Sequence, residues 1–181
     1  MARTRSGGRR YAEAAFDLAG RDSTFDRWRD DLRLAASVLG DAGVARVVGS
    51  QSLPFEERVA VIDRALSRDV QPQVLNLVRL LARRERLDLL PVVAAEFTTL
   101  LNRRRGIVPA IVTSAAPLTP AEDAAMRAKV TQLAGAEVDL STRIDPALIG
   151  GVTVRIGDRL HDASVRGRLE RLREDLLARS R

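Results

Sequence analysis

The sequence contains no cysteine, which excludes disulfides and thiolate metal sites and suits a reducing compartment. Histidine occurs only at His161, so the chain offers no thiol–imidazole pair for catalysis, and we expect a surface or packing role for this residue. Aromatic residues make up 3% of the chain, so the core must consist mainly of aliphatic side chains. No segment approaches the roughly 20 continuous apolar residues of a membrane-spanning helix, and the amino terminus lacks the apolar stretch of a secretory signal. We therefore expect a soluble protein, with any membrane association going through a partner.

Positive charge is concentrated at the amino terminus. The formal net charge is +6, and four of these charges are arginines within residues 1–10, which we interpret as a basic, flexible leader. The rest of the chain carries +2, with arginines and acids alternating as in residues 26–31, which is typical of a solvated helix surface. An isoelectric point near 11.1 makes a nucleic-acid-binding module an alternative. That module would need stacking aromatic side chains beside its basic clusters, and the clusters at residues 1–10 and 103–105 lack them.

No group of residues in the sequence forms a recognisable catalytic or ligand site. The pair Gly7–Gly8 lacks the neighbouring strand and helix of a phosphate loop, and neither GxxxxGK[ST] nor GxGxxG occurs. Four aspartates are spaced as in turns rather than as in a cation site: Asp139, Asp145, Asp158 and Asp162. We expect no enzymatic activity, no cofactor and no metal. A small enzyme with a substrate-derived site is the second alternative, and the lack of paired catalytic groups argues against it.

The first hundred residues show the periodicity of short helices. Ser23 and Asp26 are spaced as a capping box, and apolar residues follow at helical spacing up to Gly40, which can end that helix. Three prolines suit the first turns of further helices: Pro54, Pro72 and Pro91. We predict about six short helices in a compact bundle over residues 11–105.

The helix expected after Pro72 is apolar around most of its circumference. Its apolar residues are Val74, Leu75, Leu77, Val78, Leu80 and Leu81. A helix of this kind must be covered on all sides. The sequence leaves two interpretations open: a central core helix, or a helix with one face in the core and another in a groove that a partner covers.

Residues 106–181 predict a small β-α-β-β-β-α domain, which gives an α+β protein overall. The expected strands are 107–114, 138–144 and 152–156, and a turn at Gly157–Asp158 leads into a fourth. Pro109 argues for an edge position of the first strand, or for a late start. Thr119, followed by Pro120 and Glu122, predicts a capped helix up to Ala134. The pair Gly150–Gly151 beside a strand indicates a bulge, a positive φ angle or a close backbone approach.

The stretch from Val138 to Gly157 resembles the signature of the delta subunit of F-type ATP synthases, which is related to the mitochondrial oligomycin-sensitivity-conferring protein. The residues that carry this signature and a structural role include Ile144, Asp145, Gly150, Gly151, Val152 and Gly157. Segments 10–16, 76–81 and 164–170 also resemble parts of this family, so the resemblance covers essentially the whole chain. The departure from the family is the arginine-rich leader.

The resemblance implies a non-catalytic link in the peripheral stalk, present once per ATP synthase, on the cytoplasmic face of the bacterial plasma membrane. It implies a six-helix bundle that holds the amphipathic amino-terminal helix of an alpha subunit between its first and fifth helices. It also implies a small α/β domain that contacts the b subunits. On this basis the expected groove residues are Tyr11, Ala14, Ala15, Leu18, Val74, Leu77, Val78 and Leu81.

The carboxy-terminal segment carries one apolar stripe at helical spacing, formed by Val165, Leu169, Leu172 and Leu176. Two interpretations of this stripe are open. It packs on the small sheet, or it partly contacts the b subunits, in which case the arginines beside it help to orient an acidic stalk.

Overall fold

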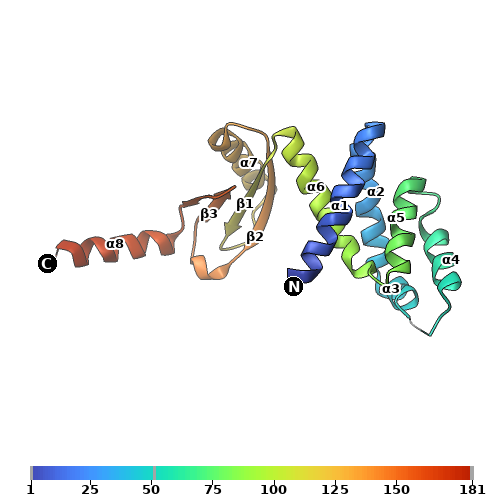
Figure 1. Cartoon of the computed structure of the whole chain (residues 1–181). Helices are drawn as coiled ribbons and strands as arrows, with labels where there is room; N and C mark the ends of the chain where they lie inside the picture. Colours follow the sequence, from blue (N-terminus) through green and yellow to red (C-terminus); the bar gives the residue numbers. More distant parts are fainter. Residues whose placement is uncertain (1, 51, 180–181) are drawn as a thin grey trace. The chain divides into compact units, whose positions relative to one another are not determined.

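The structure is a computed structural model that describes residues 2–50 and 52–179. The chain divides into two compact units, residues 1–101 and 102–181. The first unit is helical and the second combines helices with a four-stranded sheet (Figure 1), so the expected α+β class is confirmed. Among the described residues, no helix combines the length and the apolar character needed to cross a membrane.

The first unit is a bundle whose α-helices agree with the six that the sequence predicts. They are α1 (Ala2–Asp22), α2 (Phe25–Gly40), α3 (Ala42–Val48), α4 (Phe55–Leu66), α5 (Pro72–Arg83) and α6 (Leu90–Arg105), with a short 3-10 helix, η1 (Leu87–Leu89), before α6. Pro72 stands in the first turn of α5, as expected. The capping box expected at Ser23 is wrong, because Thr24 is the N-cap residue of α2 and its side chain makes no capping hydrogen bond.

The basic leader is not a segment separate from the bundle. Apart from Met1, which lies outside the described residues, it forms the first turns of α1. The glycines that the sequence shows there permit close helix packing, because a Cβ atom at Gly8 would lie 2.7 Å from Cγ1 of Val92 in α6. The expected start of the bundle at residue 11 is therefore too late.

The boundary between the units comes four residues earlier than expected. Helix α6 ends at Arg105, as predicted, but its last turn already belongs to the second unit. The side-chain amide of Asn102 donates to the carboxylate of Asp139 at 2.7 Å, which ties this turn to the sheet.

The core of the first unit has an aromatic centre within an aliphatic surround. Phe16 lies between Phe25 and Phe97, with ring centroids 4.8 and 5.5 Å away, and Trp28 stacks on Phe97 at 6.2 Å. Leucines, valines and alanines from all six helices pack around these rings. Four of the six aromatic residues of the chain are thus concentrated in the core of this unit.

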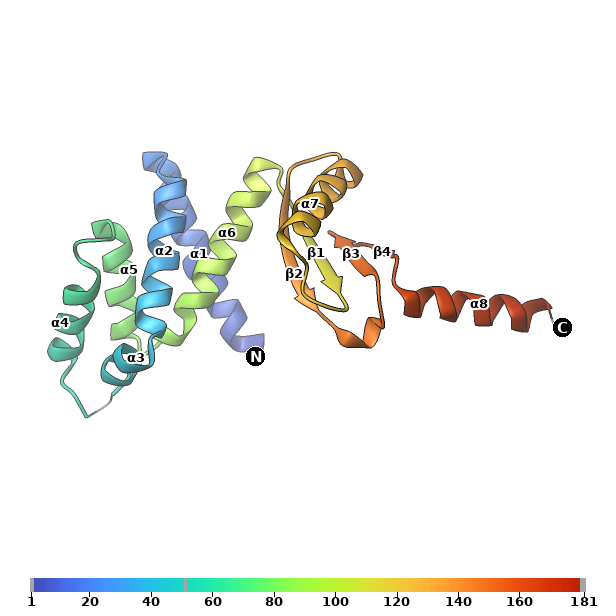
Figure 2. The same cartoon turned by 180° about the vertical axis from the view of Figure 1, so that it is seen from behind.

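The second unit is a mixed sheet with one long helix across a face (Figure 2). Its elements are β1 (Val108–Ser114), α7 (Pro120–Ala134), β2 (Val138–Ile144), η2 (Pro146–Leu148), β3 (Val152–Ile156), β4 (Arg159–Asp162) and α8 (Val165–Arg179). The strand order is β2-β1-β3-β4, with β1 parallel to β2 and the other pairs antiparallel. The small core contains Ala110, Val112, Val130, Val138 and Val154.

Pro109 lies in a central strand, so the expected edge position of β1 is wrong, whereas the alternative of a late start holds on the side that faces β3. On β1, the ladder to β3 begins at the pair Ala110 and Ile156, one residue after this proline in the chain. Gly157 donates its N–H to the carbonyl of Pro109 at 3.0 Å. A proline is tolerated there because its missing N–H falls beyond the end of the ladder.

Candidate functional site

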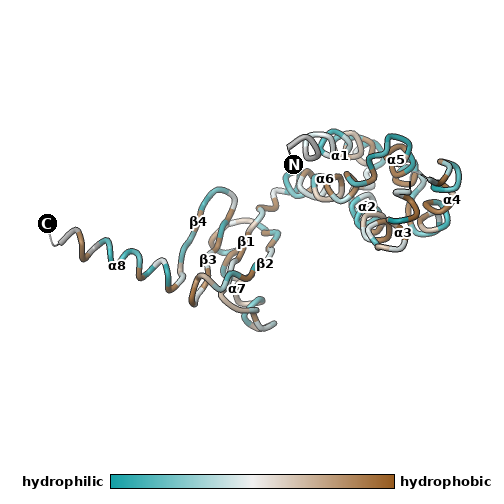
Figure 3. The backbone as a smooth tube through the Cα atoms, turned by 90° about the horizontal axis from the view of Figure 1, so that it is seen from below, coloured by the Kyte–Doolittle hydropathy of each residue, from teal (hydrophilic) through white to brown (hydrophobic). Residues whose placement is uncertain are grey.

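An apolar groove with a volume of about 600 Å³ runs between α1 and α5. These two helices lie on the same side of the bundle (Figure 3), and both pack against α2. One face of each helix lines the groove: Gly7, Arg10, Tyr11, Ala14 and Leu18 on α1, and Gln73, Asn76, Leu77 and Leu80 on α5. Both sets follow the i, i+3, i+4, i+7 spacing of a single helix face. Trp28 of α2 and Arg86 complete the lining.

Half of the residues expected in the groove line it. Tyr11, Ala14, Leu18 and Leu77 do so. The other four are buried in the core of the bundle, each at most 2% exposed: Ala15, Val74, Val78 and Leu81. Their expected role in the groove is wrong, because they lie on the inner faces of α1 and α5.

The two interpretations of α5 therefore apply to different faces of the same helix. The inner face is core, whereas Leu80 on the outer face is 43% exposed although it is apolar. Gln73, Asn76 and Leu80 also line the groove, but they were not predicted to do so from the sequence. Their helical spacing from Leu77 is the pattern that could have identified them. The contribution of Trp28 could not be predicted in this way, because the apolar spacing of α2 predicts only that this residue is in the core.

The walls of the groove are held by contacts on the far sides of the helices. The buried carboxylate of Asp31 in α2 accepts the backbone N–H of Gln71, the N-cap residue of α5, at 2.8 Å. Asp63 of α4 accepts a hydrogen bond from Nε of Arg79 at 2.8 Å, and its other oxygen forms an ion pair with Nη2 at 2.8 Å. This contact raises the pKa of Arg79 above its ordinary value. These contacts join α5 to α2 and α4 and so fix the wall of the groove that α5 forms.

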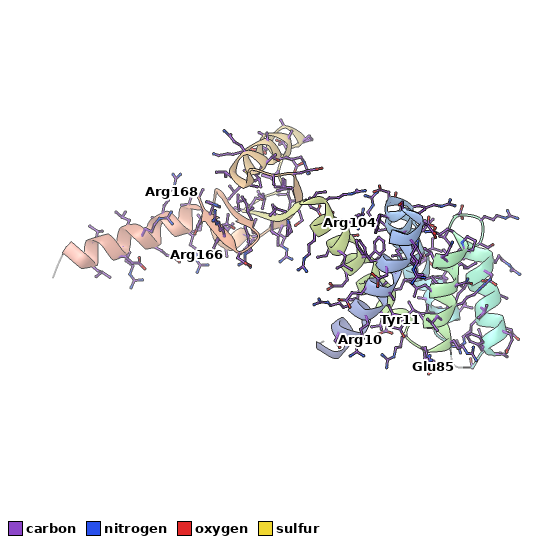
Figure 4. The ribbon with its side chains drawn as sticks, turned by 45° about the horizontal axis from the view of Figure 1, so that its top comes forward. Arg10, Tyr11, Glu85, Arg104, Arg166 and Arg168 are labelled. Atoms are coloured by element: carbon purple, nitrogen blue, oxygen red, sulfur yellow. The ribbon has the colours of Figure 1, made fainter. Side chains whose placement is uncertain are left out.

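A second exposed apolar surface lies on α8. Within its unit, α8 runs away from the sheet (Figures 1 and 2) and contacts η2 at its start. The exposed apolar side chains of α8 are Val165, Leu169, Leu172, Leu176 and Leu177. The interpretation that this stripe packs on the sheet is therefore wrong. Arg166 and Arg168 project from the first turns of the same helix (Figure 4).

The connection before α8 is fixed by backbone contacts. Gly151 has a φ of 74°, and a Cβ atom there would lie 2.6 Å from the carbonyl oxygen of Ala163. The carboxylate of Asp162 accepts the N–H of Ser164 at 2.8 Å, and the hydroxyl of Ser164 accepts the N–H of Gly167 at 3.0 Å. The sequence predicted a bulge, a positive φ angle or a close backbone approach at the pair Gly150–Gly151. The positive φ and the close approach are both found at Gly151.

Asp145, Gly150, Gly151 and Val152 of the signature lie near this connection, whereas Gly157 lies at the other end of β3. Asp145 caps η2 by accepting the N–H of Ala147 at 3.0 Å, and Gly150 accepts the N–H of Val165 at 3.0 Å. Val152 begins β3 and Gly157 lies in the turn to β4, while Ile144 at the end of β2 is exposed. Among the described residues, no three His, Cys, Asp or Glu side chains are placed to hold a metal ion.

Comparisons with known proteins agree with this architecture. A family model described as ATP synthase delta (OSCP) subunit matches residues 8–176. An ATP synthase subunit delta of Dehalococcoides mccartyi is 35% identical over 167 residues, which are 92% of each chain. An ATP synthase subunit delta of Thioalkalivibrio sulfidiphilus is 36% identical over 168 residues, 93% of this chain and 94% of its own.

A solved structure shares the fold. A chain in the Toxoplasma gondii mitochondrial ATP synthase hexamer superposes with a TM-score of 0.68 at 21% identity, covering 94% of this chain and 97% of its own. The family match spans both units described above, so it concerns the whole architecture. The chain therefore belongs to the ATP synthase delta (OSCP) subunit family and is a peripheral-stalk subunit of that enzyme.

Proposed function

We propose that the groove between α1 and α5 binds the amphipathic amino-terminal helix of an alpha subunit, while α8 binds the b subunits. The chain then links the catalytic head to the peripheral stalk without catalysing a reaction, one copy per complex and without a cofactor. ATP synthase is a membrane-associated complex. In this proposal the chain lies on the cytoplasmic face of the bacterial plasma membrane. By holding the head still, the link supports proton-driven ATP synthesis.

The apolar groove between α1 and α5 is the observation that carries this proposal. A groove between two helices accepts the apolar face of a third helix through side chains spaced i, i+3, i+4 and i+7. Burying one leucine is worth about 1.5–3 kcal/mol, so the partly exposed Leu18, Leu77 and Leu80 offer a substantial gain from which the cost of association is subtracted.

The exposed stripe on α8 supports the second half of the proposal. Leucines at helical spacing on a helix that leaves the sheet form an apolar surface of the kind that marks protein–protein contact. Arg168, Arg171 and Arg173 are exposed beside them and would orient an acidic partner helix.

Substitution in the groove tests the first half. Leu77→Asp places a charge among apolar walls, and Ala14→Trp fills the space that the incoming helix needs. We expect each variant to weaken binding of a synthetic alpha-subunit amino-terminal peptide by tenfold or more, which is on the order of one leucine burial. Isothermal titration calorimetry measures the affinity.

The matched control is Leu34→Asp, which introduces the same charge at an exposed leucine of α2 outside the groove. Circular dichroism establishes that each variant keeps its helices. Unchanged affinity in a folded Leu77→Asp variant would show that the peptide binds elsewhere.

A further inference from the structure

The charged side chains that line the groove are both arginines. Arg10 comes from α1 and Arg86 from the segment after α5, so they flank the groove from opposite walls. Both are exposed, and among the described residues neither guanidinium has an ion-pair partner. Other arginines of this unit, such as Arg9 and Arg79, are paired with acids of the chain itself.

The two arginines lie at the same end of the groove. A guanidinium nitrogen of Arg86 lies 3.7 Å from the position of a Cβ atom at Gly7, and Arg10 is one helical turn beyond Gly7. Leu18 lies about 12 Å beyond Arg10 along α1, at 1.5 Å rise per residue, and Gln73 is in the first turn of α5. The groove therefore has one cationic end and one uncharged end.

Building on the proposed function, we propose that Arg10 and Arg86 bind an acidic side chain of the docked helix and so fix its direction. Two guanidinium groups beside an apolar floor can donate several charge-assisted hydrogen bonds to one carboxylate. A helix docked in reverse would bring that carboxylate to the end beside Leu18, where no described cationic side chain lines the groove. The apolar stripe supplies affinity, and the arginine pair selects orientation.

The test uses the whole chain and a synthetic alpha-subunit amino-terminal peptide. Trp28 is the sole tryptophan and lines the groove, so its fluorescence reports binding. We expect Arg10→Gln and Arg86→Gln each to weaken binding by about two- to fivefold at low ionic strength, the range of solvent-exposed ion pairs. This loss should shrink as salt is added. Arg64→Gln in α4, an exposed arginine outside the groove, is the matched control and should bind as the original chain does.

Peptide variants identify the partner group. Each acidic residue of the peptide is changed to its amide in turn, and at one position the effect of the arginine substitutions should disappear. Arginine variants that bind as tightly as the original chain at low salt, or peptide variants that show no coupling at any position, would overturn the arginine–carboxylate pairing while leaving the groove intact. If the unmodified peptide fails to bind the unmodified chain, the proposed function fails as well.

Discussion

At the scale of single residues, the position of α5 in the groove wall depends on the carboxylate of Asp31, which does not line the groove. Asp31 is 7% exposed and holds the N–H of Gln71, which is itself buried at the start of α5. Removing the acceptor leaves this N–H without a partner in the core. We expect Asp31→Ala to lower the free energy of unfolding by about 1–3 kcal/mol, measured by urea denaturation.

The neighbouring residue provides the control for this measurement. Asp30 is an exposed acid on the same helix, paired with Arg29 at 2.8 Å. Asp30→Ala should change stability by less than about 0.5 kcal/mol. Equal losses for the two variants would mean that Asp31 contributes only surface charge, and α5 would then be positioned by its apolar contacts.

The residues of the groove could be predicted only in part from the sequence. Val78 and Leu80 have similar side chains, and a helix that is apolar all round gives no sign of which face meets the core. That distinction depends on where α1 and α2 lie, which is a long-range property. Trp28 shows the same limit, since one helix position serves both the core and the floor of the groove.

At the scale of elements, local chemistry explains most of what the sequence predicts. The capping box at Thr119 and Glu122 forms as expected, and the hydrogen bond from the backbone of Thr119 lowers the pKa of Glu122. Gly135 ends α7, also as expected. The order of the strands could not be predicted from local chemistry, because β1 pairs with both β2 and β3, which are distant in the sequence. This order places Pro109 in a central strand.

The attachment of α8 depends on a carboxylate that should remain charged in acid. Hydrogen bonds from the hydroxyl and N–H of Ser164, with the charge of Arg171, lower the pKa of Asp162 below the ordinary 3.8. Because the pKa of the folded state is the lower one, this group stabilises the connection above pH 3.8. The contribution is lost as the pH falls through the lowered pKa.

Nuclear magnetic resonance can follow this loss at the backbone amides of Ser164 and Gly167. We expect their chemical shifts to change with a midpoint below pH 3.8. Ser164→Ala should move the midpoint upward, and Asp162→Asn should remove the step. A midpoint at or above the ordinary value would mean that the hydroxyl does not bind the carboxylate in solution.

At the scale of the whole molecule, the two apolar surfaces described above belong to different compact units. The groove is built from helices of the first unit, and the leucine stripe of α8 belongs to the second. A link must hold two partners at once, so binding at one surface should not require the other. This separation can be tested with variants that alter one surface at a time.

We expect the double variant Leu172→Asp with Leu176→Asp to lose the b subunits in a pull-down while still binding the alpha-subunit peptide. Leu77→Asp should show the reverse. Both leucines of α8 are more than half exposed, so the double variant should unfold at nearly the same temperature as the original chain. Leu133→Asp in α7, at a leucine that is 52% exposed, controls for added charge on this unit.

The crossed design separates a structural from a binding role for α8. A large drop in melting temperature would show that the stripe packs against the protein in solution, whatever happens to the b subunits. Retention of the b subunits at full stability would place their binding surface elsewhere on the second unit. If instead either set of substitutions abolished both interactions, the two surfaces would act as one, and a link made of two independent attachments would be the wrong description of this subunit.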